Sequence, residues 1–566
     1  MIEINKPLEC DILVAGGGAG GMQAAIDAAD CGASVIIAEK ANTLRSGNCA
    51  TGNDHFQCYI PDVHGSDEQE WLNLLANSQE ARGGRDIDLM EMLLRTSKGV
   101  VLDWESYGIN MRPHGYWEFT GHCHPGLQGI HLKFEGRDMK RVLTKEALKR
   151  GVRILNRHPL AELITNDNNE VCGAILADLT QEIPRMQVIR AKSVILATAG
   201  TYRISGDTTM GWMFNAHQCP VNTGAGKAAA YNAGARLVNF DSVHFSRNEF
   251  KFFRRGGKNT WVGVFSDIDG RPIGPFISKP DWRYGDFTAD VRRDVFSDNY
   301  KKGNPVFMNC SEGTDEDLAY MKWALVHEGN GATLKHLEDE GFDFRRHQVM
   351  FSYGISGGPG PFGNGIDANG SGETTLKGLY AAGQTLGNGI GGISPAACLG
   401  RVAARNAAVY TKGKDIEPAE EYDAAIRNAE IFSRLLANEV STATPSWYEA
   451  NIAIMQTNWE FNGQPVRSDK MLKTGLHHMQ RIRAKLDNLH CSCSHEFMRC
   501  LEVRELALQS ELSFIAALSH HESRGNIHNV DWPDADPDMD NMMITIQLES
   551  GKPVTGLRKK RTTQEN

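Results

Sequence analysis

Three glycines, Gly16, Gly18 and Gly21, form a G-x-G-x-x-G pattern in the segment DILVAGGGAGGMQAAIDAADCGASVIIAE. In such a pattern the first glycine permits a tight turn, the second lets backbone approach a diphosphate, and the third lets a helix pack closely on a strand. Free N–H groups at the start of the following helix favour the negative diphosphate. Glu39 follows about 20 residues further on, where a carboxylate can accept hydrogen bonds from ribose hydroxyls. The pattern predicts a dinucleotide site that could take either NAD or FAD.

Two later segments look like the second half of the same site. AKSVILATAG is an apolar strand pattern that ends at Ala199 and Gly200. GLYAAG is another such strand, and it leads through a glycine-rich loop into a helix of small residues that starts near Ser394. The expected elements are therefore strands that end in glycine loops, each followed by a helix, as in an α/β fold.

Composition limits the classes of protein that remain. The 566 residues allow several domains, and a net charge of −10 gives no electrostatic case for nucleic acid or an anionic membrane as the main partner. No run approaches the roughly 18 apolar residues of a membrane helix, and the first residues do not read as a signal peptide. Twelve scattered cysteines indicate free thiols in a reducing compartment, so we expect a cytoplasmic protein.

Two clusters of histidine and cysteine could suggest a metal. WEFTGHCHPGLQGIH (117–131) contains an HxH pattern beside a cysteine, which could bind a metal or lie in a loop over the substrate. HCSCSHEFMRC (490–500) leads into an amphipathic helix pattern, with Cys500 along that helix. The 117–131 segment has no second cluster at a familiar spacing, and no CxxCxxCxxxC run occurs in the chain. We therefore assign no metal and no iron–sulfur cluster to this chain.

The order of these motifs resembles the flavoprotein family of fumarate reductase and succinate dehydrogenase. The early glycine motif, the ATAG strand and the late GLYAAG strand occur in the same order, and TGAGKAAAYNAGARLVNFDSVHF and ESRGNIHNVDWP match further family segments. The resemblance covers nearly the whole chain and favours FAD over NAD. It implies FAD contacts from the early motif, the two strand ends and the late loop: Gly16, Gly18, Gly20, Gly21, Glu39, Lys40, Ala199, Gly200, Gly383, Gln384, Gly391, Gly392 and Ser394.

The polar segment LRSGNCATGN resembles the family segment that runs along the flavin ring. The implied contacts in it are Arg45, Ser46, Gly47, Asn48, Thr51 and Gly52, although Arg45 can also be read as a solvated loop arginine. Relatives with covalently bound flavin have a histidine immediately after the serine that matches Ser46. Because Gly47 stands there, we expect non-covalent FAD.

Within the family the resemblance is closest to the adenylylsulfate reductase alpha subunit, on RSGNCATG, WESYG, FRRGGKNTWVGVF and TTLKGLYAAG. Trp212 falls near a substrate tryptophan, and Arg254 and Arg255 would form an anion site. Two positions depart from that relative. Tyr353 stands for its catalytic histidine, and Arg137 stands for a glutamate. A tyrosine with an ordinary pKa can donate a proton but is a poor base at neutral pH.

Fumarate and succinate enzymes offer the other comparison. Their substrate histidine matches His244, and their catalytic arginine matches Arg293, whereas a second substrate arginine matches Gly389. By pattern alone, a surface ion pair is the simpler interpretation of Arg293, and a position in the core is the simpler interpretation of His244. A dicarboxylate usually has two cationic partners, so the loss of one weakens a simple fumarate assignment. The substrate therefore stays open.

We predict an α/β fold: a split Rossmann-like FAD-binding domain (1–245 and 345–412), an inserted α+β capping domain (246–344), a C-terminal helical domain (413–525) and an irregular tail (526–566). The resemblance implies an FAD-dependent oxidoreductase subunit in a hetero-oligomer. It would exchange two electrons with a small anionic substrate and with a separate ferredoxin-like iron–sulfur subunit. The alternatives are adenylylsulfate reductase itself, which converts adenylylsulfate to sulfite and AMP, and a non-catalytic flavin electron-transfer subunit.

Overall fold

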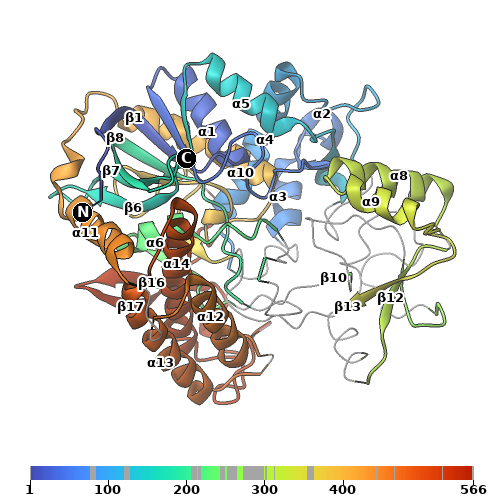
Figure 1. Ribbon diagram of the computed structural model, residues 1–566. Helices are drawn as coiled ribbons and strands as arrows, with labels where there is room; N and C mark the ends of the chain where they lie inside the picture. The colour runs from blue at the N-terminus through green and yellow to red at the C-terminus, as the bar shows by residue number, and fades with distance from the viewer. Residues whose placement is uncertain are drawn as a thin grey trace.

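A computed structural model shows how the chain folds (Figure 1). It describes residues 2–76, 84–119, 128–205, 213–214, 218–242, 249–250, 264–271, 299, 302–311, 313–352, 363–439, 444–464, 466–525 and 527–563.

The main sheet has seven strands and carries the glycine motif. Its order is β5-β2-β1-β8-β7-β6, and β15 also pairs with β8. The strands are β1 (Leu8–Ala15), β2 (Val35–Glu39), β5 (Arg153–Asn156), β6 (Leu160–Thr165), β7 (Val171–Asp178), β8 (Arg185–Leu196) and β15 (Leu379–Ala381). Strands β5, β2, β1, β8 and β15 pair in parallel, whereas β7 is antiparallel to β6 and β8. The early and late motifs therefore share one sheet, and the predicted α/β fold is confirmed.

Helices cover the parallel part of this sheet. They are α1 (Ala19–Asp30), α4 (Ile87–Tyr107), α5 (Met139–Lys149) and α10 (Ile393–Tyr410), with α2 (Pro61–His64) and α3 (Glu68–Ala76) at the periphery. Helix α6 (Ala225–Asn232) is mostly buried and contacts β6. Helix α10 lies beside α1 although it starts more than 350 residues later in the chain (Figure 1). The largest hydrophobic core lies between these helices and the strands, and it includes Met22, Ile26, Trp104 and Leu143.

A smaller sheet shows that the prediction of an irregular tail was wrong. Strands β16 (Met542–Glu549) and β17 (Lys552–Lys559) form a hairpin, and β16 pairs with β9 (Leu237–Val238), which pairs in turn with β14 (Gly365–Ile366). The hairpin is also held by ion pairs. Arg558 and Arg561 both contact the buried carboxylates of Asp86 and Asp367. The Asp- and Pro-rich composition of 531–540 hid the alternating pattern that follows it.

The segment predicted as a cap contains an antiparallel sheet and a helix pair. The sheet order is β10-β13-β12-β11, with β10 (Glu249–Phe250), β11 (Val264–Ser266), β12 (Val306–Asn309) and β13 (Val349–Ser352). Helices α8 (Asp315–His327) and α9 (Gly331–Asp339) lie beside the FAD-binding part (Figure 1). Because β13 belongs to this sheet, the unit extends to Ser352 rather than ending at the predicted residue 344.

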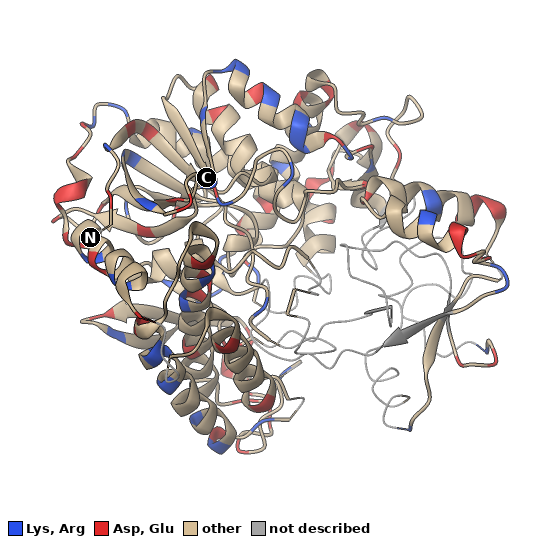
Figure 2. Cartoon of the chain, in the orientation of Figure 1, with Lys and Arg blue, Asp and Glu red and all other residues tan. Residues whose placement is uncertain are grey.

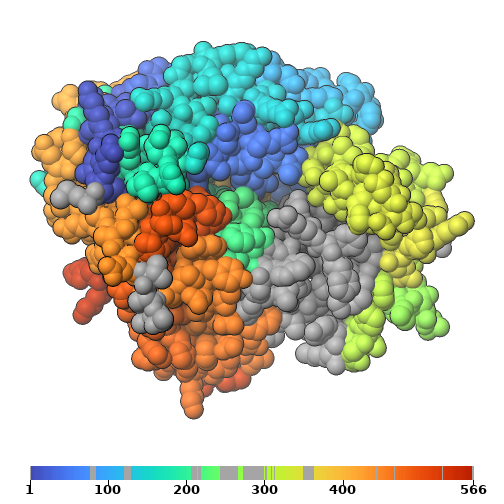
Figure 3. Space-filling view, viewed as in Figure 1, coloured from blue at the N-terminus to red at the C-terminus, as the bar shows by residue number. Residues whose placement is uncertain are grey.

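The C-terminal helices form a bundle whose hydrophobic core also includes residues of β6, β7 and β8. They are α11 (Asp423–Ala437), α12 (Trp447–Phe461), α13 (Asp469–Lys485) and α14 (Ser494–Leu518). In the space-filling view the orange helices pack against the blue and green N-terminal part (Figure 3). The yellow helices α8 and α9 lie at the right of this view, away from the orange helices. Charged residues of both signs are distributed over the outer helices rather than gathered by sign (Figure 2).

Two cysteines of the 490–500 cluster lie in the core of this bundle. Cys491 and Cys500 are buried, and their thiols donate to the carbonyl oxygens of Leu435 and His490, at 3.3 and 3.7 Å. The described cysteines form no disulfide. Of the other predicted cluster, only His131 belongs to the described residues; it starts β4 (His131–Lys133), which pairs with β3 (His55–Gln57).

Candidate active site

The early glycines form a tight strand-to-helix turn. Gly16 follows β1 with φ +103°, a conformation that side chains other than glycine rarely adopt. A Cβ atom on Gly21 would lie 1.8 Å from Gly16 O, so the first turn of α1 rests directly on the loop. A Cβ atom on Gly18 would meet no atom within 4 Å. The chain therefore leaves no room for a side chain at Gly21 but leaves space at Gly18, where the motif predicts the diphosphate.

Glu39 lies at the end of β2 and touches this loop. One carboxylate oxygen accepts from Gly17 N at 2.7 Å, and the other accepts from Ala41 N at 2.8 Å. Each carboxylate oxygen has two acceptor positions, so Glu39 keeps the capacity to bind ribose hydroxyls. Lys140 of α5 was not anticipated from the sequence; it is buried and donates to Gly17 O.

The late loop reaches the same place through the contact of two helices. A Cβ atom on Gly20 would lie 2.8 Å from Ala396 O, and one on Gly400 would lie 2.3 Å from Gly20 O. Helix α10 therefore packs against α1 through backbone. Gly391 and Gly392 precede α10, and Ser394 in its first turn donates to Gln57 O. The N-terminus of α10, which favours negative charge, thus lies beside the segment that contains Gln57.

Asn48 connects three segments of the predicted site. Its side-chain amide donates to Gln384 Oε1 at 2.7 Å and to Tyr202 OH at 3.3 Å. Its carbonyl oxygen accepts from Cys219 N at 3.1 Å and from Asn222 Nδ2 at 2.8 Å. A single half-buried side chain therefore holds the 44–52 segment to the late loop and to the segment after β8.

The strand end at Ala199 and Gly200 is shaped by an unusual backbone conformation. Ala199 has φ +64°, which is uncommon for a residue other than glycine and costs some strain. The preceding residue, Thr198, accepts a hydrogen bond from Gly226 N at 3.0 Å. The turn after β8 is thus fastened to the start of α6.

Lys40 is directed into a buried charge network. Its ammonium lies 2.6 Å from Glu502 Oε1 and donates to Val221 O at 2.8 Å. Arg203 and Arg499 also pair with Glu502, both at 2.7 Å. Burial alone would raise the pKa of Glu502, but these three cations outweigh it and hold that pKa at about 2. In this structure Lys40 joins the FAD-binding part to α14, a role that its place after Glu39 did not suggest.

The predicted flavin segment also meets the cap. A Cβ atom on Gly52 would lie 2.5 Å from His327 O at the end of α8 and 2.7 Å from Arg137 Cα. Arg137 is exposed, so its guanidinium is available at this junction. Arg45 is exposed as well. The other predicted catalytic and substrate residues lie outside the described residues: Arg293, His244, Tyr353, Arg254, Trp212 and Arg255.

The residues present fit an FAD. Ser46 Oγ and Thr43 Oγ1 are buried in the predicted ring segment and loop, and neither has a hydrogen-bond partner among the described residues. Buried polar atoms are usually satisfied, so these two indicate a ligand that supplies partners. The open space at Gly18 and the free N–H groups at the start of α1 suit a diphosphate. Together they describe a dinucleotide cradle with a polar ring-binding segment.

Sequence reasoning missed three further groups. Lys227 of α6 is completely buried and donates to Asn364 Oδ1 at 2.9 Å, and desolvation lowers its pKa to about 7. Glu505 of α14 accepts from Thr223 Oγ1, and burial raises its pKa to about 7. Asp54, His55 and Glu328 form a cluster. Of these groups, only Lys227 could have been singled out from the sequence, because it stands among alanines and glycines in TGAGKAAAY.

This fold and site define an FAD-dependent oxidoreductase. Residues 11–246 match the FAD binding domain family, and residues 453–563 match the fumarate reductase flavoprotein C-terminal family. The chain belongs to the fumarate reductase and succinate dehydrogenase flavoprotein family, as its motif order predicts.

Relatives cover nearly the whole chain. It is 24% identical to one polypeptide of the CoM/CoB fumarate reductase of Methanothermobacter marburgensis, over 94% of this chain and 96% of that protein. It is also 24% identical to L-aspartate oxidase of Vibrio cholerae, over 93% and 96%. Its fold matches adenylylsulfate reductase of Archaeoglobus fulgidus with a TM-score of 0.81, at 19% identity, over 100% of this chain and 98% of that one. A quinol fumarate reductase of E. coli matches with a TM-score of 0.78, at 16% identity, over 99% and 98%. Among the described residues, the helices are all too short or too polar to cross a bilayer.

Proposed function

We propose that this chain is the flavoprotein subunit of an oxidoreductase that acts on a small anionic substrate and exchanges electrons with a separate iron–sulfur subunit. The observation that carries the proposal is the junction at Gly52, where the predicted flavin segment, Arg137 and the end of α8 meet. A cation at such a junction can bind an anion between two domains, which is a common place for a substrate.

Bound FAD would supply two-electron chemistry, and the chain's own residues would bind and orient it. Glu39 would hold the ribose, and the open backbone at Gly18 would receive the diphosphate. Asn48 would fix the ring segment to Gln384. The N-terminus of α10, which lies beside the segment that contains Gln57, would offer partial positive charge to the bound cofactor. The cap helices would help to exclude water.

We further propose that the FAD is not covalently bound. Gly47 follows Ser46 at the position where a linking histidine would be needed, and glycine has no side chain to form the bond. Acid precipitation of the purified protein should therefore release the flavin into the supernatant. Flavin that stayed with the pellet would contradict this part of the proposal.

One experiment distinguishes a sulfur substrate from an alkene substrate. The purified protein is photoreduced without oxygen, and the flavin spectrum is followed while fumarate, other enoates or adenylylsulfate are added. Oxidation by fumarate or another enoate alone places the enzyme with alkene reductases. Oxidation by adenylylsulfate, or a spectral change with sulfite that AMP competes for, identifies adenylylsulfate reductase. Oxidation by one-electron carriers but by no member of the panel favours the non-catalytic role.

Arg137 provides the matched variant. We expect R137Q to raise the KM of the active anion by about 10- to 100-fold, because a hydrogen bond to a charged group contributes about 1.5–3 kcal/mol. R141Q is the control, since Arg141 lies on the exposed side of α5 and pairs with Asp138. Equal effects of the two substitutions would show that Arg137 acts only through the general surface charge.

A further inference from the structure

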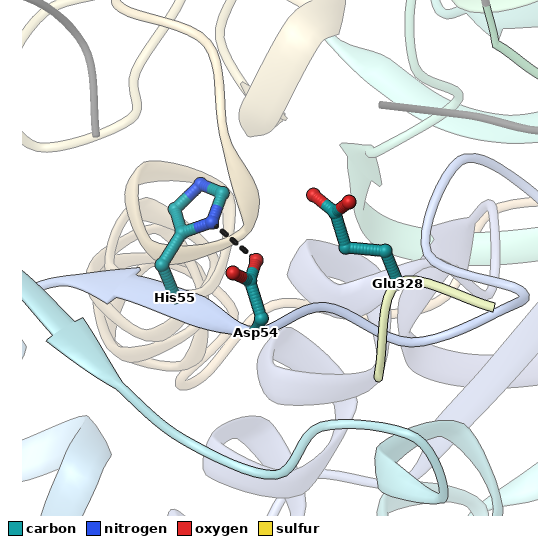
Figure 4. A group of neighbouring side chains, drawn as sticks. All are labelled: Asp54, His55 and Glu328. Atoms are coloured by element: carbon teal, nitrogen blue, oxygen red, sulfur yellow. Dashed lines mark hydrogen bonds and ion pairs between the residues drawn. The ribbon is translucent and has the colours of Figure 1, made fainter. Parts of the chain in front are cut away.

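Asp54, His55 and Glu328 bring three metal-binding side chains to one buried place (Figure 4). One potential ligand atom from each lies within 4.8 Å of the other two, and all three residues are buried. His55 Nδ1 lies 2.7 Å from Asp54 Oδ1. Asp54 and His55 lie at the start of β3, whereas Glu328 caps the end of α8, and Figure 4 shows its carboxylate extending toward the other two.

The backbone holds these two segments together, so the cluster does not depend on flexible side chains alone. A Cβ atom on Gly329, the residue after Glu328, would lie 2.0 Å from Thr51 Cβ. A Cβ atom on Gly52 would lie 2.5 Å from His327 O. Each glycine therefore permits a close approach that a larger residue would prevent. The ligands of a metal site need this kind of support from rigid elements.

The surroundings are suited to a cation with nitrogen and oxygen ligands. The ring of His131 lies 5.3 Å from that of His55, and Tyr320 OH lies 3.5 Å from Asp54 Oδ2. Among the described residues, this is the one group of three or more such side chains arranged closely enough to share an ion. An imidazole with two carboxylates and no thiolate suits Zn²⁺ or a neighbouring divalent transition ion.

We propose that Asp54, His55 and Glu328 bind a divalent cation of the Zn²⁺ type at the junction of the FAD-binding part and the cap. Ligand atoms about 2.0–2.2 Å from such an ion lie roughly 3–4 Å from one another, so the observed separations need only small side-chain adjustments. With three protein ligands, the ion would keep a position for water. It would also connect β3 to α8 and so hold the cap. This proposal replaces the expectation from sequence that the chain binds no metal.

A second buried cluster provides a matched control. His520 Nδ1 lies 2.7 Å from Asp241 Oδ2, and its Nε2 lies 3.3 Å from Glu522 Oε1. This set contains the same three residue types, but Glu522 is held by the guanidinium of Arg524 at 3.0 Å. The two carboxylates also contact opposite nitrogens of the imidazole ring, so the three side chains do not direct their ligand atoms to one point, and the second cluster should not retain a metal.

The test measures metal content directly and needs no substrate, so it stands apart from the proposed function. The FAD-loaded protein is dialysed against Zn²⁺, Mn²⁺, Fe²⁺ or Co²⁺ without oxygen, and bound metal is measured by mass spectrometry. We expect about one equivalent of Zn²⁺ or a competing ion in the wild type and in H520Q, and loss of most of it in H55Q and E328Q. Bound Co²⁺ should add ligand-field bands at longer wavelengths than the flavin absorbs, without thiolate charge-transfer bands.

Two results would overturn the proposal. One is the absence of stoichiometric binding of all four ions by the wild type. The other is metal content that H55Q and E328Q leave unchanged, which would place the ion elsewhere. Thermal denaturation with and without Zn²⁺ guards against misfolding: Zn²⁺ should raise the Tm of the wild type and H520Q, but not that of a folded E328Q.

Discussion

Replacement of Gly18 by alanine tests the placement of the diphosphate. Gly18 has φ −73° and ψ −173°, a conformation that any residue can adopt, and an added Cβ would meet no atom of the chain within 4 Å. The apoprotein should therefore lose no stability, and it could gain about 0.4–1 kcal/mol from reduced freedom of the unfolded chain. Bound FAD changes this, because the new methyl group would stand where the diphosphate approaches the backbone.

The expected loss of FAD affinity follows from the hydrogen bonds between the backbone and the diphosphate. A hydrogen bond between backbone and a charged group contributes about 1.5–3 kcal/mol, so displacing the diphosphate from one such bond should weaken FAD binding about 10- to 100-fold. The assay is titration of apoprotein with FAD, followed by flavin fluorescence, with the Tm of the apoprotein measured in parallel.

Gly21 provides the contrasting substitution. Its Cβ would lie 1.8 Å from Gly16 O, far inside the 3.0 Å that real Cβ contacts keep, so α1 or the loop must shift by about an ångström. G21A should therefore destabilise the apoprotein by at least the 1–3 kcal/mol typical of overpacking, besides weakening FAD binding. The diphosphate does not approach the backbone at Gly18 if G18A binds FAD as tightly as wild type, or if G18A lowers the Tm of the apoprotein as much as G21A does.

Two buried charges both predict that stability rises with pH, because each has a lower pKa in the folded than in the unfolded state, but they act in different pH ranges. The folded pKa of Lys227, about 7, lies below its unfolded value of about 10.4, so its penalty of roughly 4–5 kcal/mol is complete below pH 7 and disappears as pH rises to about 10.4. K227M should stabilise the protein by a few kcal/mol in denaturant titrations near pH 6 and by almost nothing near pH 10; an equal change at both would refute this. The folded pKa of Glu502, about 2, lies below its ordinary 4.5, so its contribution is present above pH 4.5 and is lost as pH falls toward 2. E502Q should cost about 3–5 kcal/mol at neutral pH, because Arg203 keeps its buried charge without a carboxylate, and the difference from wild type should shrink on acidification. An E502Q protein as stable as wild type at neutral pH would contradict it.

The sequence could predict what local patterns encode. The turn at Gly16, the helix after it and the strand that ends at Glu39 each depend on a short run of residues, and the structure has all three. The family resemblance added the relation between the early and late loops. The hydrogen bond from Asn48 to Gln384, across 336 positions, follows from neither, because an asparagine in a polar loop has many possible partners.

The features that the sequence did not predict depend on tertiary contacts. Lys40 follows a strand whose pattern predicts a cofactor contact, and its ion pair with the buried Glu502 of a distant helix is a tertiary contact that no local pattern indicates. Glu328 caps an ordinary helix, and the close backbone contacts at Gly52 and Gly329 bring it to His55. The strand at Met542–Glu549 pairs along its whole length with β17, and its pairing with the distant β9 places this hairpin in the smaller sheet.

That last pairing constrains how the protein can be made. Strand β9 lacks its β16 partner, and the carbonyl of Gly234 lacks its donor Gln547, until the end of the chain has been made. Gln547 lies 313 positions after Gly234 in the sequence. During synthesis, most of the chain emerges from the ribosome before this partner exists. The carboxylates of Asp86 and Asp367 likewise have no ion pair with Arg558 and Arg561 until these arginines have been synthesised. The FAD-binding part should therefore reach its final form only after translation has passed the hairpin, and chaperones would have to protect the exposed edge of β9 until then.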